Sequence, residues 1–334
     1  MRTTTLIVLT FALSLLNIGC DSESSRDAIF YNNRGLAYYN QGELDKAIVD
    51  YNKAIELAPQ LALAYSNRGL AYHNQGELDK AIIDCSKAIS LDPQLDAAYN
   101  NRGLAYNDQG ELDKAMVDYN KALELAPADA YALNNRGLAY YNQGELDKAI
   151  IDCSKAISLD PQLDAAYNNR GLAYNDQGEL DKAIVDYNKA IELAPADAIT
   201  YNNRGIAYYH QGELDTAIVD YNKAISLDPQ LALAYNNRGL AYSDQGELNK
   251  AFIDYNKAIK FDPQLALAYN NRGTAYYQQG ELDKAIGEFT KSIGLDPQLA
   301  LAYANRGFVF EELGNKVNAE VDYAKAKELG RDLE

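Results

Sequence analysis

Small and apolar residues recur along most of the chain with a helical spacing. Tyr31, Gly35 and Tyr38 lie at i, i+4 and i+7, and a second set over residues 47–54 repeats that spacing. Each set forms one stripe of an amphipathic helix. A glycine separates the two stripes, and Pro59 follows the second, where it prevents the helix from continuing. The pattern therefore predicts a helical hairpin.

The same hairpin pattern occurs nine times with a period of 34 residues. All the prolines are spaced by that period: Pro59, Pro93, Pro127, Pro161, Pro195, Pro229, Pro263 and Pro297. We take Ala28 as position 1 of the repeat. A single hairpin cannot bury both of its stripes, so neighbouring copies must stack into a solenoid. The expected repeats are residues 28–61, 62–95, 96–129, 130–163, 164–197, 198–231, 232–265, 266–299 and 300–333.

The repeat resembles the tetratricopeptide repeat (TPR). The glycine at position 8 and the alanine at position 20 are present in every copy. The residues of the first copy that match the TPR pattern are Tyr31, Gly35, Tyr38, Ala47, Tyr51, Ala54 and Pro59. The resemblance covers residues 28–333 and implies an all-α, right-handed superhelical solenoid whose concave groove binds partner peptides.

The last copy departs from the others at three apolar positions, which become Lys316, Glu320 and Lys327. A terminal repeat has no neighbour to cover these positions. We therefore expect residues 300–333 to form a C-terminal cap and the array to be complete.

The first residues have the pattern of an export signal. Arg2 precedes the apolar run Leu6–Leu16, which is shorter than the roughly 20 residues of a membrane-spanning helix. The run ends at Gly19-Cys20, which resembles the lipobox of bacterial lipoproteins. The resemblance implies a signal peptide over 1–19, a lipidated Cys20 and a tether over 20–27, and hence an exported protein anchored in the bacterial cell envelope by its lipid. An ordinary cleaved signal with an incidental cysteine is the alternative, since Asn17 stands where the lipobox usually has leucine.

Composition and charge restrict the chemistry. The formal net charge is −17, which disfavours nucleic acid as a partner. The chain has only two histidines, His73 and His210, in different copies of the repeat, and it has no P-loop, HExxH or nucleophile-elbow motif. We therefore expect no metal, no cofactor and no enzymatic activity.

Two frequent residue types are expected to be structural. Of the 27 tyrosines, 22 lie at positions 4, 11 and 24 of the repeat, so the tyrosine content indicates a core and not a stacking surface for ligands. Cys85 and Cys153 occupy position 24 in two copies that are 68 residues apart, too far for a disulfide and consistent with buried thiols. Arginine at position 7 and a carboxylate at position 23 recur in every copy, which favours ion pairs between the two helices over ligand binding.

One stripe of the first helix is not explained by packing within the hairpin. It carries positions 2, 5, 9, 12 and 13, the face that lines the groove in TPR arrays. Its expected apolar contacts are Leu36, Leu70, Leu104, Leu138 and Leu172 at position 9, and Tyr39, Tyr141, Tyr209 and Tyr277 at position 12.

Position 6, beside this stripe, is asparagine in every copy: Asn33, Asn67, Asn101, Asn135, Asn169, Asn203, Asn237, Asn271 and Asn305. An asparagine amide both donates and accepts, so it can pair with any peptide group. The row resembles the asparagine ladder in the TPR superhelix of O-GlcNAc transferase. The same amides could instead bond neighbouring helices, and the sequence leaves both interpretations open.

These features predict a non-enzymatic scaffold for protein–protein interactions that binds extended peptide segments in its groove. Neutral or basic segments with apolar side chains are expected, because Asn32 and Leu36 stand where a carboxylate clamp for chaperone termini would need basic residues. The alternative is a structural spacer or self-assembling envelope scaffold that captures no peptide.

Overall fold

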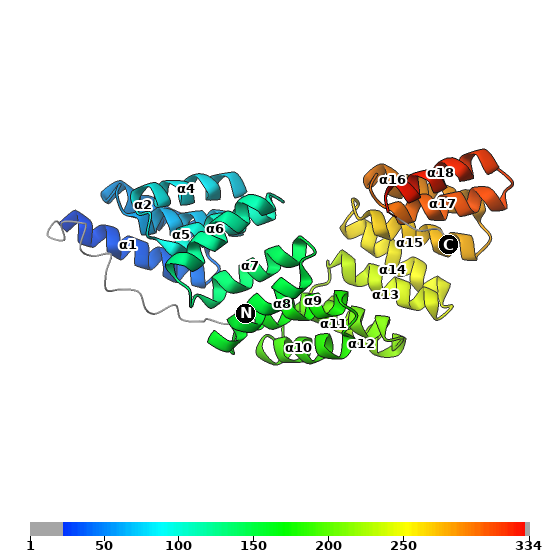
Figure 1. The fold of residues 1–334 in the computed structure, drawn as a ribbon, viewed down its shortest axis with the longest axis horizontal. Helices are drawn as coiled ribbons and strands as arrows, with labels where there is room; N and C mark the ends of the chain where they lie inside the picture. Colours follow the sequence, from blue (N-terminus) through cyan, green and yellow to red (C-terminus); the bar gives the residue numbers. More distant parts are fainter. Residues whose placement is uncertain (1–22, 331–334) are drawn as a thin grey trace. The chain divides into compact units, whose positions relative to one another are not determined.

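The computed structural model describes residues 23–330, which contain 18 α-helices and no β-strand, two helices for each repeat (Figure 1). The first helices of the repeats are α1 (Glu23–Asn40), α3 (Ala62–Asn74), α5 (Asp96–Asp108), α7 (Ala130–Asn142), α9 (Asp164–Asp176), α11 (Ala198–His210), α13 (Ala232–Asp244), α15 (Ala266–Gln278) and α17 (Ala300–Glu312). The second helices are α2 (Leu44–Leu57), α4 (Leu78–Leu91), α6 (Leu112–Leu125), α8 (Leu146–Leu159), α10 (Leu180–Leu193), α12 (Leu214–Leu227), α14 (Leu248–Phe261), α16 (Leu282–Leu295) and α18 (Lys316–Glu328). The all-α repeat solenoid predicted from the sequence is confirmed.

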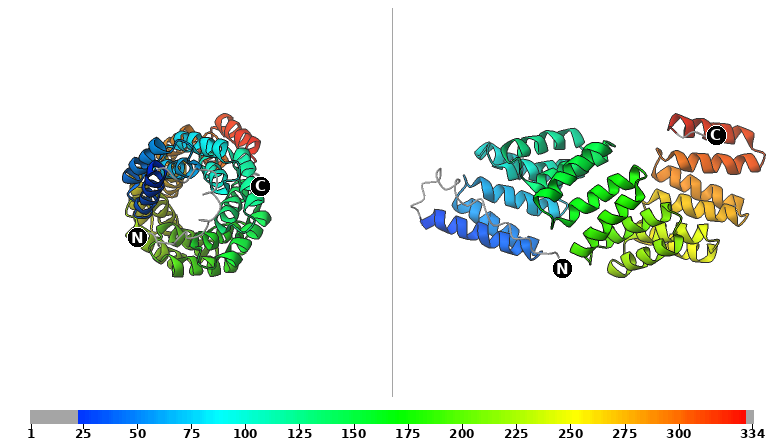
Figure 2. Two further views of the ribbon diagram at one scale, coloured as in Figure 1. Left: turned by 90° about the vertical axis from the view of Figure 1, so that its left-hand side faces the viewer. Right: turned by 60° about the horizontal axis from the view of Figure 1, so that its bottom comes forward.

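The helices form two units, which divide between Glu179 and Leu180. Within each unit, every helix packs against the helices that precede and follow it (Figure 2). Neighbouring first helices of a unit also approach one another within 8 Å between Cα atoms, whereas neighbouring second helices do not. Each unit therefore curves toward its first helices, which lie on its inner side.

Glycine and proline set the limits of the helices. The turn inside each hairpin contains a glycine with positive φ, from 79° at Gly42 to 73° at Gly314, a conformation that other residues rarely adopt. Glu43 then precedes α2, and Asp45 lies in its first turn, where a carboxylate stabilises the positive end of the helix dipole. The second helix ends at Leu57, just before Pro59.

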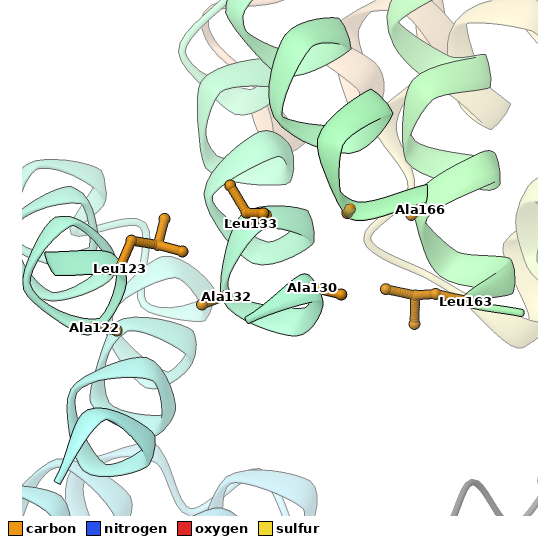
Figure 3. Close-up of a cluster of buried hydrophobic side chains, with 8 residues drawn as sticks. Ala122, Leu123, Ala130, Ala132, Leu133, Leu163 and Ala166 are labelled. Carbon is orange, nitrogen blue, oxygen red and sulfur yellow. The ribbon is translucent and has the colours of Figure 1, made fainter. Parts of the chain in front are cut away.

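Small residues on one helix accommodate large rings on its partner. The fully buried ring of Tyr119 on α6 lies against Gly103 on α5, where an added Cβ would be only 2.7 Å from Cε1 of the ring. Between repeats, Leu123 of α6 points toward Leu133 of α7, beside Ala132 (Figure 3). The expected assignment of most tyrosines to the core agrees with this packing.

The structure departs from the expected boundary at residue 27. Residues 23–27, assigned to the tether from the sequence, are the first turns of α1. In the later repeats a proline precedes the first helix by three residues, whereas no proline precedes Ala28, so α1 extends back to Glu23. At the other end, Lys316, Glu320 and Lys327 are exposed, as expected for the last repeat. Cys20 and the expected signal peptide lie outside the described residues.

Candidate peptide-binding face

The candidate site is the inner face of each unit, which we define as positions 2, 5, 6, 9, 12 and 13 of the first helices. The five leucines at position 9 that the sequence singled out are half-buried, as are Tyr39, Tyr141, Tyr209 and Tyr277. Position 2 is more open, with exposed fractions of 56% at Ile199 and 45% at Leu233. The face therefore offers partly accessible apolar side chains along the first helices.

The asparagines of position 6 bond neighbouring first helices. The Nδ2 of Asn135 donates to Oδ1 of Asn100 in the preceding repeat at 3.0 Å, and Asn271 donates to Asn236 at the same distance. Asn67, Asn169, Asn237 and Asn305 make the same bond, and Asn101 donates to Ser66. Asn101, Asn169 and Asn203 are buried, Asn33 is exposed, and the others are half-buried.

This geometry supports the interpretation that the row has a structural role. One N–H of each bonded amide is committed to the preceding repeat, so only the second N–H can reach a ligand. The sequence shows the asparagine at position 6 in every copy and at position 5 in seven copies. It does not show that position 6 of one repeat bonds position 5 of the preceding repeat, 35 residues earlier.

A second row of bonds joins position 12 of one repeat to position 13 of the next. The hydroxyl of Tyr141 donates to Asp176 at 2.8 Å, and that of Tyr209 donates to Asp244 at 2.5 Å. Burial, followed by the nearby Asp176 carboxylate, raises the pKa of Tyr141 to about 12. These tyrosines, expected to be free aromatic contacts, are therefore held in place by a neighbouring repeat.

The inner face is neutral to acidic. Its six positions contain no lysine or arginine in any copy of the repeat, whereas Asp108, Asp176, Asp244, Glu311 and Glu312 all lie at positions 12 and 13. Such a face attracts basic segments and repels acidic ones.

The arginines of position 7 form the predicted ion pairs within the hairpin. Nε and Nη2 of Arg238 donate to the two carboxylate oxygens of Asp254, both at 2.7 Å, and the other pairs described have equivalent bonds. The carboxylate of Asp254 is almost fully buried. The sequence interpretation of these arginines as structural is confirmed for the described pairs.

The remaining reactive side chains do not form a cluster. Cys85 and Cys153 are buried thiols that are not joined in a disulfide, and burial raises the pKa of Cys85 to about 12. Nε2 of His73 lies 2.8 Å from an oxygen of Asp108, and His210 is exposed. Within residues 23–330, no three His, Cys, Asp or Glu side chains come together as metal ligands. None of the helices in this range has the length and apolar character needed to cross a membrane.

The fold and the inner face define a helical-repeat protein of the kind that binds other proteins. A family profile described as TPR repeat matches residues 35–76, 103–144, 171–212, 207–246, 241–280 and 273–314, and one described as tetratricopeptide repeat matches 62–95 and 130–163. The chain belongs to the tetratricopeptide repeat family, whose repeats indicate a protein-interaction scaffold.

Solved structures share this fold at low sequence identity. A chain of the APC/C hetero-tetramer Cut9–Hcn1 is 17% identical, with a TM-score of 0.66 over 92% of this chain and 74% of that one. A tetratricopeptide repeat protein from Parabacteroides merdae is 24% identical, with a TM-score of 0.58 over 75% of this chain and 99% of its own. Human IFIT1, crystallised as a dimer with m7Gppp-AAAA, is 16% identical, with a TM-score of 0.65 over 92% and 83% of the two chains. No curated protein matches the chain by sequence.

Proposed function

We propose that this chain is a non-enzymatic scaffold that binds extended, neutral to basic peptide segments along the inner face of its first helices. The observation that carries the proposal is the composition of that face: half-buried leucines at position 9, carboxylates at position 13 and no lysine or arginine. Apolar side chains of the peptide would contact the leucines, and the remaining N–H groups of the asparagines would donate to its backbone carbonyls.

A competition between matched surfaces tests the proposal. Peptides of 12 residues selected from a random phage library on the full chain would be measured by fluorescence anisotropy. Changing Leu138 and Leu172 together to Glu should weaken binding at least tenfold, because both side chains lie on the inner face. The control, Ile151→Glu, changes a side chain that is 66% exposed on α8, the second helix of the repeat that contains Leu138, and should leave binding unchanged. Equal losses of peptide affinity in the two variants would show that the inner face is not the binding site.

The polarity of the face can be tested separately. Peptides with two added lysines should bind more tightly than peptides with two added glutamates, and the difference should shrink at 1 M salt, where charge interactions are screened. A preference for the acidic peptides would contradict the proposed electrostatic selection.

We also propose that the chain is exported and held in a bacterial envelope by acyl chains on Cys20. The support is the apolar run that ends at Gly19-Cys20. Two or more acyl chains are needed for a durable anchor. Labelling with palmitate and the intact mass of the chain, compared with Cys20→Ser, test this directly. A chain that is not labelled at Cys20 would exclude the anchor without affecting the proposed peptide binding.

A further inference from the structure

Each junction between successive repeats uses one recurrent arginine contact. In every repeat from the second to the ninth, Nη1 of the position 7 arginine donates to an Asn, Ser or Thr at position 25 of the preceding second helix. The distances run from 2.5 Å for Arg68 to Asn52 to 3.0 Å for Arg306 to Thr290. Each of these bonds spans two repeats.

Aromatic and apolar side chains complete the junction. The guanidinium of Arg238 lies between the rings of Tyr235 and Tyr242, 5.6 and 5.9 Å from their centroids. Ile225, at position 28 of the preceding helix, packs in the same cluster as Tyr235. At the next junction Phe252, at position 21, contacts the ring of Tyr276 at 4.7 Å. We call the second helix of the preceding repeat the covering helix. It contacts the next repeat through an apolar residue at position 21, Asn, Ser or Thr at position 25, and an apolar residue at position 28.

The first helix of repeat 1 has the surface that a covering helix contacts in the later repeats, but no described helix packs over it. We call it the open end face and define it as Phe30, Tyr31, Arg34 and Tyr38. Arg34 still donates from Nε and Nη2 to Asp50 at 2.6 and 2.7 Å. Its side chain is 44% exposed, against 15–21% for the other arginines whose pairs are described.

Two further features of the open end face concern its side chains and its shape. Phe30, at position 3, is 56% exposed, whereas the same position in repeats 2–9 holds alanine or threonine with at most 2% exposure. A hollow of about 290 Å³ beside Arg34 is lined by Tyr38, Lys46 and Val49, among others. A large aromatic ring therefore replaces a small residue at the one repeat where no preceding helix is described.

A second copy of the chain does not supply the covering helix. The equivalent positions of α18, the last second helix, hold Glu320, Ala324 and Lys327 in place of the apolar, Asn/Ser/Thr and apolar residues. Stacking α18 on the open end face would bury two charges and leave Arg34 without its acceptor.

We propose that the open end face is a docking site for an amphipathic helix of a partner protein. That helix carries apolar side chains at i and i+7 and Asn, Ser or Thr at i+4, the pattern that covers the same surface at all eight internal junctions. Phe30 needs room that alanine does not, so the helix also carries glycine at i+6, where covering helices of this chain hold an alanine in the same buried cluster as the position 3 alanine. This site is distinct from the inner face and uses a helix, not an extended segment.

The probe for this site is a stapled helical peptide with the sequence of residues 112–125 that carries the substitution Ala122→Gly. Its Met116, Asn120 and Leu123 provide the required pattern. We expect saturable binding to the full chain by fluorescence anisotropy, weakened at least tenfold by Phe30→Glu in the chain or by Met116→Lys with Leu123→Lys in the probe. Ile253→Glu, at an apolar side chain that is 57% exposed on the second helix α14 and lies on neither the open end face nor the inner face, is the matched control and should bind normally.

Three outcomes would overturn the proposal. Absence of saturable binding, or binding that Phe30→Glu leaves unchanged, would remove the open end face as a helix site. Leu6, Thr10 and Leu13 carry the same i, i+4, i+7 pattern. If the probe binds only when Leu6→Asp and Leu13→Asp are both present in the chain, the open end face would be assigned to the chain's own first residues and not to a partner.

Discussion

The close contact between position 8 and position 24 makes a quantitative prediction about the core. In Gly239→Ala the new Cβ would lie 2.8 Å from Cε1 of Tyr255, 3.0 Å from its Cδ1 and 3.3 Å from the carbonyl oxygen of Ala251. The ring of Tyr255 is fully buried, so it has no free space into which to rotate. Overpacking of this kind costs about 1–3 kcal/mol.

The matched control is Gly287→Ala on α16, where an added Cβ meets nothing within 4 Å. Both glycines lie inside helices, and alanine gains about 1 kcal/mol over glycine in a helix interior. That gain is common to both variants, so the difference between them isolates the overpacking cost of about 1–3 kcal/mol.

Native-state hydrogen exchange is the suitable assay, because unfolding of a repeat array need not be two-state. Protection of the α13 and α14 amides in Gly239→Ala should fall below that of the α16 amides in Gly287→Ala, each relative to the unmodified chain, by a factor of about 5 to more than 100. Gly287→Ala alone should increase protection. Equal protection in the two variants would mean that the tyrosine ring gives way, and the close-packed interface would be refuted.

Three further predictions concern buried polar groups. Asp254→Ala should cost about 3–5 kcal/mol by native-state hydrogen exchange of its hairpin, because it leaves a guanidinium that is 15% exposed without its carboxylate. Asp50→Ala should cost less, since its arginine is 44% exposed. Asn271→Ala should cost about 1 kcal/mol by the same exchange measurement, through its lost bond between repeats. The exposed Asn33 lies in the first described repeat and should tolerate alanine, so equal costs would contradict the structural role of the row. Burial raises the pKa of Cys85 to about 12, so the contribution of this thiol to stability is present below its unfolded pKa of about 8.5 and is lost as pH rises toward 12. Alkylation of the folded chain by iodoacetamide at pH 8 should be far slower than alkylation in denaturant, and equal rates would contradict the burial.

The fold was predictable because each copy of the repeat restates the same pattern. The position 8 glycine and the position 20 alanine are present in all nine copies and the position 32 proline in the first eight, and each has one physical reason. The pairing of Arg238 with Asp254 was also predictable, since a charge that recurs beside a core stripe at both helices requires a partner on the other helix.

The contacts between repeats were harder to predict. The amide of Asn135 meets Asn100 across 35 residues, one residue more than the period, and this offset depends on how neighbouring hairpins are rotated against one another. The same offset joins Tyr141 to Asp176. A helical wheel describes one helix at a time, so it placed these side chains on the correct face but could not show which residue of the neighbouring repeat each one bonds.

The two ends of the described array also bear on the alternative of self-assembly. The last repeat carries Lys316, Glu320 and Lys327 at positions that pack against the next repeat elsewhere in the chain, while the first repeat keeps its aromatic and arginine residues. Head-to-tail stacking requires the two surfaces to be complementary, and a surface with three charges does not complement one built for apolar side chains. The asymmetry favours a scaffold that receives partners at its first repeat and along its inner face over one that extends itself by repetition.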